Sequence, residues 1–197
     1  MPKVVDHDVQ RETFARAAMR LMAKHGLEGV TMRAVAAEAG LSYGSLFHYF
    51  DSKNALLLYA VEYLAGQQTR RVNEYESQYA GLKALEHLLC DDAIVNDTSR
   101  DSWMVWMTFQ YKVAHEPTFA ERHADMINGW LSRIAALLKD AIVRGEIRDA
   151  LDVELEALGL WAYSSGVGQM GLLHPRSMTA ARQKQLIAAY LDKLRRN

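Results

Sequence analysis

Hydroxyl, aromatic and basic side chains follow one another closely between residues 31 and 53, in a pattern suited to binding DNA. Groups in the first turn of a short helix can meet base edges in the major groove. We assign this role to Ser42, Tyr43, Gly44 and Ser45. Groups that flank such a helix can contact phosphates, which fixes the register without reading the sequence. The candidates for phosphate contact are Thr31, Arg33, His48, Tyr49 and Lys53.

A second group of large side chains is suited to enclosing a small molecule. On a helix over residues 100–114, four of them share one face because they lie three or four positions apart. Aromatic faces with a nearby carboxylate would hold a quaternary amine by cation–π attraction. The alternative is a hydrophobic core that happens to use large residues. The ligand-binding candidates are Glu62, Trp103, Trp106, Met107, Gln110, Trp130, Tyr163 and Met170.

The DNA-binding candidates need short helices held at a fixed angle, and the sequence predicts such helices. Thr31 and Ser42 stand at N-cap positions before helices expected over Met32–Ala39 and 43–50. Gly40 supplies the permissive backbone of the turn between them. An amphipathic helix over residues 9–25 precedes them and offers a packing partner. Their small core is expected to contain Val35, Leu41, Leu46 and Phe50.

The rest of the chain also has helical periodicity and no convincing strand. Thr98 and Asp101 resemble a capping box, which predicts a helix from about residue 100. We therefore expect an all-α fold of about nine helices. Residues 1–52 would be a three-helix, helix–turn–helix DNA-binding domain, and residues 53–197 a helical ligand-binding and dimerisation domain. The further helices are predicted over residues 51–78, 81–90, 100–114, 117–144, 152–173 and 179–194.

Composition limits the classes of protein that fit. The chain has 197 residues, of which 50% are hydrophobic and 24% charged, as in an ordinary globular protein. The single Cys90 and the lack of an apolar signal segment predict a cytoplasmic location. The net charge is −1, but residues 1–53 carry +1 against −2 for the remainder. This weak charge predicts DNA binding that depends on geometry and dimerisation.

Signals of enzymatic or metal chemistry are poor. Residues 166–171 match GxGxxG, but they lie late in a helical pattern, whereas the nucleotide-binding fingerprint needs a preceding strand. Close helix packing is the better interpretation of these glycines. Neither an HExxH nor a Glu-x-x-His motif is present, although a metal site near His115, Glu116, His123 and Asp125 is conceivable. We expect no enzyme activity, no cofactor and no bound metal.

The order of features from Arg11 to Leu64 resembles the DNA-binding domain of the TetR family of bacterial transcriptional regulators. The resemblance rests on Phe14-x-x-Ala17, Thr31-Met32-Arg33-x-Val35-Ala36, Ala39-Gly40-Leu41-Ser42 and Leu46-Phe47-His48-Tyr49-Phe50. Residues 103–172 resemble, more weakly, the C-terminal domain of the BetI-like branch, through Trp-x-x-Trp, His-Glu-Pro and Gly-Glu-Ile.

This resemblance implies a homodimeric repressor that binds a pseudo-palindromic operator and is released by a small-molecule effector. In the family, the last two helices of each subunit form a four-helix dimer interface. The corresponding candidates here are Leu160, Ser164, Val167, Gly168, Leu172, Ile187, Leu191 and Leu194. Two alternatives stay open: a helical enzyme or metal carrier, and a regulator of the same family that activates transcription or needs no ligand.

Overall fold

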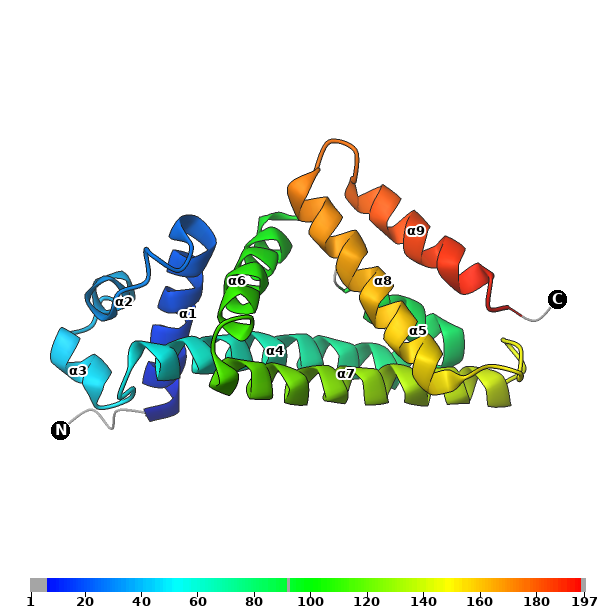
Figure 1. Ribbon diagram of the computed structural model, residues 1–197, viewed down its shortest axis with the longest axis horizontal. Helices are drawn as coiled ribbons and strands as arrows, with labels where there is room; N and C mark the ends of the chain where they lie inside the picture. Colours follow the sequence, from blue (N-terminus) through cyan, green and yellow to red (C-terminus); the bar gives the residue numbers. More distant parts are fainter. Residues whose placement is uncertain (1–6, 92, 196–197) are drawn as a thin grey trace. The chain divides into compact units, whose positions relative to one another are not determined.

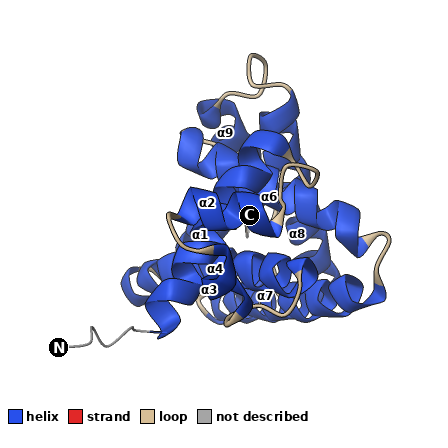
Figure 2. Ribbon diagram, turned by 90° about the vertical axis from the view of Figure 1, so that its left-hand side faces the viewer, coloured by secondary structure: helices blue, strands red, loops and turns tan. Residues whose placement is uncertain are grey.

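The computed structural model describes residues 7–91 and 93–195, and this part of the chain contains nine α-helices and no regular strand (Figures 1 and 2). An isolated bridge joins Ile147 and Arg195. The predicted all-α fold class is therefore confirmed. The helices are α1 (His7–His25), α2 (Met32–Ala39), α3 (Tyr43–Phe47), α4 (Lys53–Gln78), α5 (Gly81–Cys90), α6 (Asp97–Val113), α7 (Pro117–Val143), α8 (Val153–Leu173) and α9 (Ala180–Asp192).

Two helix boundaries differ from the prediction by three residues, and the others differ by two or fewer. Helix α3 ends at Phe47 rather than at residue 50, because the next N–H groups bond three residues back: that of His48 to Ser45 and that of Tyr49 to Leu46. Helix α6 begins three residues earlier than expected. The N–H of Ser99 donates to Oδ1 of Asn96 at 2.9 Å, so Asn96 caps this helix and the proposed Thr98 capping box is wrong.

The chain divides into two compact units. The first unit comprises the chain up to Gln67 together with Asp101–Ala120, and the second comprises Gln68–Arg100 and the chain from Glu121 onwards. Helices α4, α6 and α7 each contribute residues to both units. This division describes packing, and the functional division into residues 1–52 and 53–197 stays a prediction.

In the first unit, α1 packs on α2 and α2 packs on α3. Phe14, Leu46 and Phe50 are buried in its core, with the Phe14 and Phe50 rings edge to face at 6.4 Å. The guanidinium of Arg11 lies 5.4 Å from the Phe50 ring centroid and 4.5 Å from that of Tyr59. This cation–π arrangement ties α1 to the residues after α3 and to α4.

In the second unit, α5 packs against both α8 and α9, which run side by side in opposite directions (Figure 1). Carboxylates from the end of α7 and from the turn after it hold the first turn of α5, since the N–H of Gly81 donates to Asp140 at 2.8 Å and that of Leu82 to Glu146 at 2.7 Å. These bonds satisfy two N–H groups that a helix start leaves unpaired. Among the described helices, none is both long and apolar enough to cross a membrane.

Candidate DNA-binding site

Local caps determine where α2 and α3 begin and end. Oγ1 of Thr31 accepts the N–H of Ala34 at 3.1 Å, and Oγ of Ser42 accepts the N–H of Ser45 at 3.0 Å. Gly40 ends α2 with φ +67°, a left-handed conformation that favours glycine. The caps predicted from the sequence are present. Each cap uses an oxygen lone pair, so the same hydroxyl can still donate its hydrogen to a phosphate.

One face of α3 is turned to solvent while the opposite face enters the core. Leu46 is fully buried and Ser45 half-buried. Tyr43 and Phe47 are each 45% exposed, although both are large and apolar. The exposed residues of this corner are Ser42, Tyr43, Gly44, Phe47 and His48. Four of these five are among the residues that the sequence predicts to contact DNA. Phe47 is not among them, although its position four residues after Tyr43 places it on the same helix face.

Arg33 brings α2 to the same surface. Its guanidinium lies 5.5 Å from the ring centroid of Tyr43, and the Tyr43 ring meets that of Phe47 edge to face at 5.0 Å. Arg33 and Thr31 are both exposed. The surface therefore combines a permanent positive charge, two hydroxyl groups and two aromatic rings.

Tyr49 faces inward instead. Its hydroxyl donates to Oε1 of Gln10 at 2.8 Å, and its ring packs 5.8 Å from that of Phe14. The side chain is thus engaged by α1, and its contact with a phosphate, which would use the same hydroxyl hydrogen, stays a prediction. The sequence does not reveal this, because the partner lies 39 residues away.

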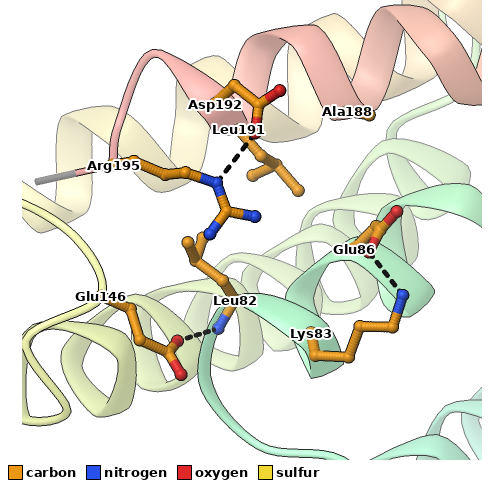
Figure 3. Close-up of a pocket in the computed structure, with 8 residues that line it drawn as sticks. All are labelled: Leu82, Lys83, Glu86, Glu146, Ala188, Leu191, Asp192 and Arg195. Atoms are coloured by element: carbon orange, nitrogen blue, oxygen red, sulfur yellow. Dashed lines mark hydrogen bonds and ion pairs between the residues drawn. The ribbon is translucent and has the colours of Figure 1, made fainter.

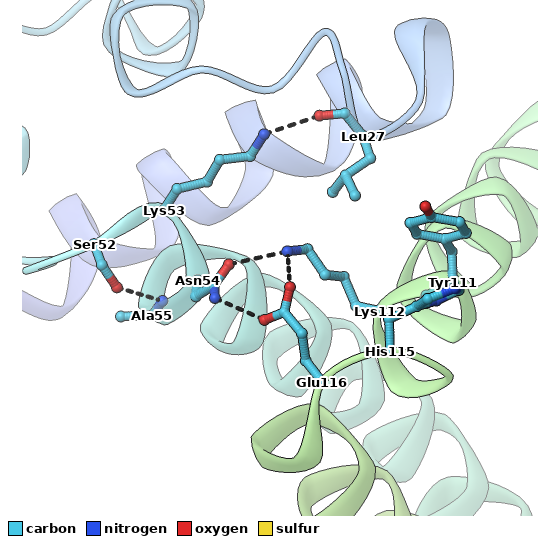
Figure 4. Close-up of polar contacts among 9 residues, drawn as sticks. All are labelled: Leu27, Ser52, Lys53, Asn54, Ala55, Tyr111, Lys112, His115 and Glu116. Atoms are coloured by element: carbon cyan, nitrogen blue, oxygen red, sulfur yellow. Dashed lines mark hydrogen bonds and ion pairs between the residues drawn. The ribbon is translucent and has the colours of Figure 1, made fainter.

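Lys53 is also engaged within the unit (Figure 4). Its Nζ donates to the backbone carbonyl of Leu27 at 3.0 Å. Burial, and then the charge of Lys112, lowers the pKa of Lys53 below its ordinary value. Lys53 therefore holds the loop after α1 through one of its three ammonium hydrogens, and its contact with a phosphate stays a prediction.

Next to Lys53, Asn54 joins α4 to the end of α6. Its amide Nδ2 donates to Glu116 at 2.8 Å, and its Oδ1 accepts from Nζ of Lys112 at 3.3 Å (Figure 4). Lys112 and Glu116 also form an ion pair. These three side chains, which we call the Asn54 network, connect α6 with the start of α4 inside the first unit.

The predicted ligand-binding residues divide between the two units. Trp103, Trp106 and Met107 are half-buried on α6, but Gln110 is exposed, and Glu62 lies in the first unit with them. The second unit holds the remaining three, Trp130, Tyr163 and Met170. Of these, Trp130 packs against the core, the hydroxyl of Tyr163 donates to the Leu186 carbonyl at 3.2 Å, and Met170 is 43% exposed.

A groove of about 240 Å³ lies in the second unit (Figure 3). Its charged groups are already paired: Lys83 with Glu86 at 2.8 Å, Arg195 with Asp192 at 2.8 Å, and Glu146 with the N–H of Leu82. No ligand-binding candidate lines it. The lining residues are Leu82, Lys83, Glu86, Glu146, Ala188, Leu191, Asp192 and Arg195.

The dimer-interface prediction needs correction at seven of its eight positions, because those residues are buried within the subunit. Leu160 and Ile187 are each 1% exposed, and Leu191 and Leu194 each 3%, because all four belong to the core between α5, α8 and α9. A partner subunit cannot reach side chains that fill the core of their own subunit. Ser164, Val167 and Gly168 are also buried, and Leu172 is half-buried.

Instead, α8 turns a different set of residues outward. Their spacings of 3, 4, 7, 1 and 3 residues place them on one face of the helix, so they form one stripe. Leu155 is 66% exposed, Leu158 46% and Leu173 55%. We call this set the α8 stripe; its members are Leu155, Leu158, Ala162, Gln169, Met170 and Leu173.

The described residues contain no group of three or more histidine, cysteine or acidic side chains placed to hold a metal ion. The ring of His115 instead lies beside that of Tyr111, tilted by 30° with centroids 4.5 Å apart, and its Nδ1 lies 2.7 Å from the Tyr111 carbonyl oxygen.

Models of known protein families match both the N-terminal and the C-terminal part of the chain. Residues 15–60 match the model of bacterial regulatory proteins of the tetR family. Residues 83–196, more than half of the chain, match the C-terminal region of BetI-type transcriptional repressors.

Individual regulators are similar in sequence to this chain over nearly its full length. The regulator PksA of Bacillus subtilis (strain 168) is 26% identical over 195 residues, covering 98% of this chain and 94% of PksA. BetI of Stenotrophomonas maltophilia (strain R551-3) is 26% identical over 197 residues, covering 98% and 96%.

Two solved structures share the fold. A TetR-family regulator from Rhodococcus sp. gives a TM-score of 0.85 at 21% identity, covering 96% of this chain and all of that one. A regulator from Saccharomonospora viridis, solved in complex with choline, gives 0.86 at 23% identity, covering 94% and 96%. The chain therefore belongs to the TetR family of bacterial transcriptional regulators and is a DNA-binding regulator rather than an enzyme.

Proposed function

We propose that the chain is a cytoplasmic repressor that leaves its operator when a small effector binds. Two subunits would present two α3 helices to half-sites about 34–36 Å apart, or a multiple of that, on a pseudo-palindromic operator. The observation that carries the proposal is the solvent-facing surface of α3, which exposes Tyr43, Phe47 and His48 while Leu46 fills the core. Arg33, which lies over the Tyr43 ring, supports it as a phosphate contact, and the exposed Thr31 at the start of α2 is a second candidate.

The first test is DNA binding by a variant of that surface. Fragments selected from genomic DNA of the source organism are labelled, and binding is followed by fluorescence anisotropy. Tyr43→Ala should weaken specific binding at least tenfold, since it removes a ring that contacts both Arg33 and Phe47. Tyr111→Ala is the matched control, because Tyr111 is an exposed aromatic of the same unit that lies on α6. Equal affinity of both variants for the operator would contradict the proposal.

The α8 stripe supports a specific dimer interface. Leu155, Leu158 and Leu173 expose large apolar side chains on one helix face, and such a face is stabilised when a second helix covers it. The α8 stripe of a second subunit would do so symmetrically. The buried leucines of the α5–α8–α9 core would then support the interface from behind.

The effector is proposed to be a quaternary amine, with choline as the first compound to test. Support comes from the half-buried Trp103 and Trp106 on α6, from Glu62 in the same unit, and from the choline bound to the Saccharomonospora relative. A thermal-shift screen should show stabilisation by choline but not by the uncharged, isosteric 3,3-dimethyl-1-butanol. Absence of any stabilising amine would favour the alternative of a regulator without this ligand.

Effector binding would act through the Asn54 network. A ligand changes DNA affinity only if it binds the two conformations of the protein with different affinity. Lys112 and Glu116 follow directly on the tryptophan-rich part of α6, and both bind Asn54 at the start of α4. A shift of α6 would therefore move the helix that follows the DNA-contacting surface.

A further inference from the structure

Phe47 is an apolar ring on the surface of α3. It is 45% exposed, although its neighbour in sequence, Leu46, is fully buried. A half-exposed phenylalanine contributes less to folding than a buried one, because much of its apolar area stays in water. Packing in the core of the first unit therefore does not explain why a phenylalanine stands at this position.

The ring of Phe47 is supported on one side. Tyr43 meets it edge to face with centroids 5.0 Å apart, and the guanidinium of Arg33 lies 5.5 Å from the centroid of the Tyr43 ring. Residues four apart share a helix face, so the pair Tyr43 and Phe47 points in one direction. This contact restricts the rotation of Phe47 before any ligand binds.

The chemistry of a phenyl ring limits what it can read in DNA. It has neither a donor nor an acceptor, so it cannot recognise the polar edges of guanine, adenine or cytosine. In the major groove, the apolar group available to such a side chain is the 5-methyl group of thymine. Contact with the sugar–phosphate backbone would be independent of sequence.

We propose that Phe47 selects thymine at one position of each half-site by packing against its 5-methyl group, with Tyr43 holding the ring in place. This inference rests on the DNA-binding role of α3. It adds a specificity-determining residue that hydrogen-bonding patterns alone do not reveal. 5-Methylcytosine carries the same methyl group at the same place. When cytosine is substituted for this thymine, its methylation should therefore recover part of the lost affinity.

The test replaces thymine by deoxyuridine, which removes only the methyl group. An operator duplex selected by the wild-type protein is made with symmetric substitutions at each thymine in turn, and binding is measured by fluorescence anisotropy. One position should weaken wild-type binding about fourfold per half-site, the factor expected for one methyl group removed from an apolar contact. Phe47→Ala should bind the thymine and deoxyuridine duplexes equally at that position.

Two further variants separate the possible causes. Phe47→Leu keeps an apolar side chain and should retain part of the preference for thymine. Tyr111→Ala, which removes an exposed aromatic outside α3, should leave that preference unchanged. Circular dichroism checks that each variant keeps its helices.

The outcomes distinguish this inference from the proposed function. The wild-type protein could bind the operator specifically while no deoxyuridine substitution has an effect that Phe47→Ala removes. That result overturns the inference and leaves the DNA-binding role intact. A uniform loss of affinity in Phe47→Ala, equal for both kinds of duplex, also overturns it and points to backbone contact. Failure of the wild-type protein to select any duplex would contradict the proposed function itself.

Discussion

The carboxylate of Asp140 accepts the backbone N–H of Gly81 at 2.8 Å, so the end of α7 holds the start of α5. The same carboxylate accepts the guanidinium of Arg144 at 2.8 Å. The Arg144 guanidinium and then the Gly81 N–H lower the pKa of Asp140 below its ordinary value. Both interactions favour the charged form of Asp140.

Asp140→Ala should lower the free energy of unfolding at pH 7 by about 1 kcal/mol, as the loss of a helix cap does. Since the folded state lowers the pKa, this stabilisation is complete above the unfolded pKa of about 3.9 and is lost as the pH falls through the folded value. Urea unfolding at pH 7, 4.5 and 3.5 should show the difference from wild type shrinking at the lowest pH. Asp140→Asn keeps an acceptor and is the control, with a smaller loss at pH 7.

Gln183, which is 1% exposed, should be required for stability of the second unit. Its Oε1 accepts the N–H of Ile94 at 2.9 Å, and its Nε2 donates to the carbonyl of Met178 at 2.8 Å. Gln183→Leu leaves both backbone groups without this partner, so we expect a loss of about 2 kcal/mol or more in urea unfolding. Gln185→Leu, at an exposed position of α9, should change stability by less than about 0.5 kcal/mol.

Leu158→Glu should dissociate the dimer, because it places a charge in the α8 stripe. Size-exclusion chromatography with light scattering should show a helical monomer that binds the operator weakly. Val95→Glu introduces the same charge at another exposed apolar residue of the second unit, which is 52% exposed, and should stay dimeric. A dimeric Leu158→Glu protein would show that another surface forms the interface.

Asn54→Ala should uncouple effector binding from DNA release, since it removes the link between α4 and the pair Lys112 and Glu116. The affinity for the effector should remain close to wild type, while the effector-induced fall in operator affinity becomes smaller by at least threefold. Asn128→Ala, at an exposed position of α7, is the control. An unchanged ratio of operator affinities with and without effector would exclude this route.

The helix–turn–helix could be predicted closely because its signals are local. A cap such as Thr31 or Ser42 bonds an N–H three residues away, and Gly40 adopts its conformation without help from distant residues. The end of α3 was less predictable, because Tyr49 turns toward Gln10 in α1. Contacts between residues far apart in sequence leave no periodic pattern.

The glycines of α8 also have a role that depends on residues distant in sequence and that the sequence pattern therefore does not reveal. The sequence suggested close helix packing around Gly166 and Gly168. The structure leaves open space around a Cβ at Gly166, whereas a Cβ at Gly171 would lie 2.5 Å from the side chain of Gln183. Gly171 thus makes room for a buried polar side chain, whose partners Ile94 and Met178 come from two loops.

The sequence by itself determined the helical elements, the caps of α2 and α3, and the family to which the chain belongs, because these depend on residue types at short spacing. Only the tertiary structure decided which side chains face outward. Helix α8 carries apolar residues around its whole circumference, so its periodicity cannot say whether Leu160 or Leu158 enters the core. Packing against α5 and α9 buries Leu160 and leaves Leu158 exposed, which moves the proposed interface to the α8 stripe.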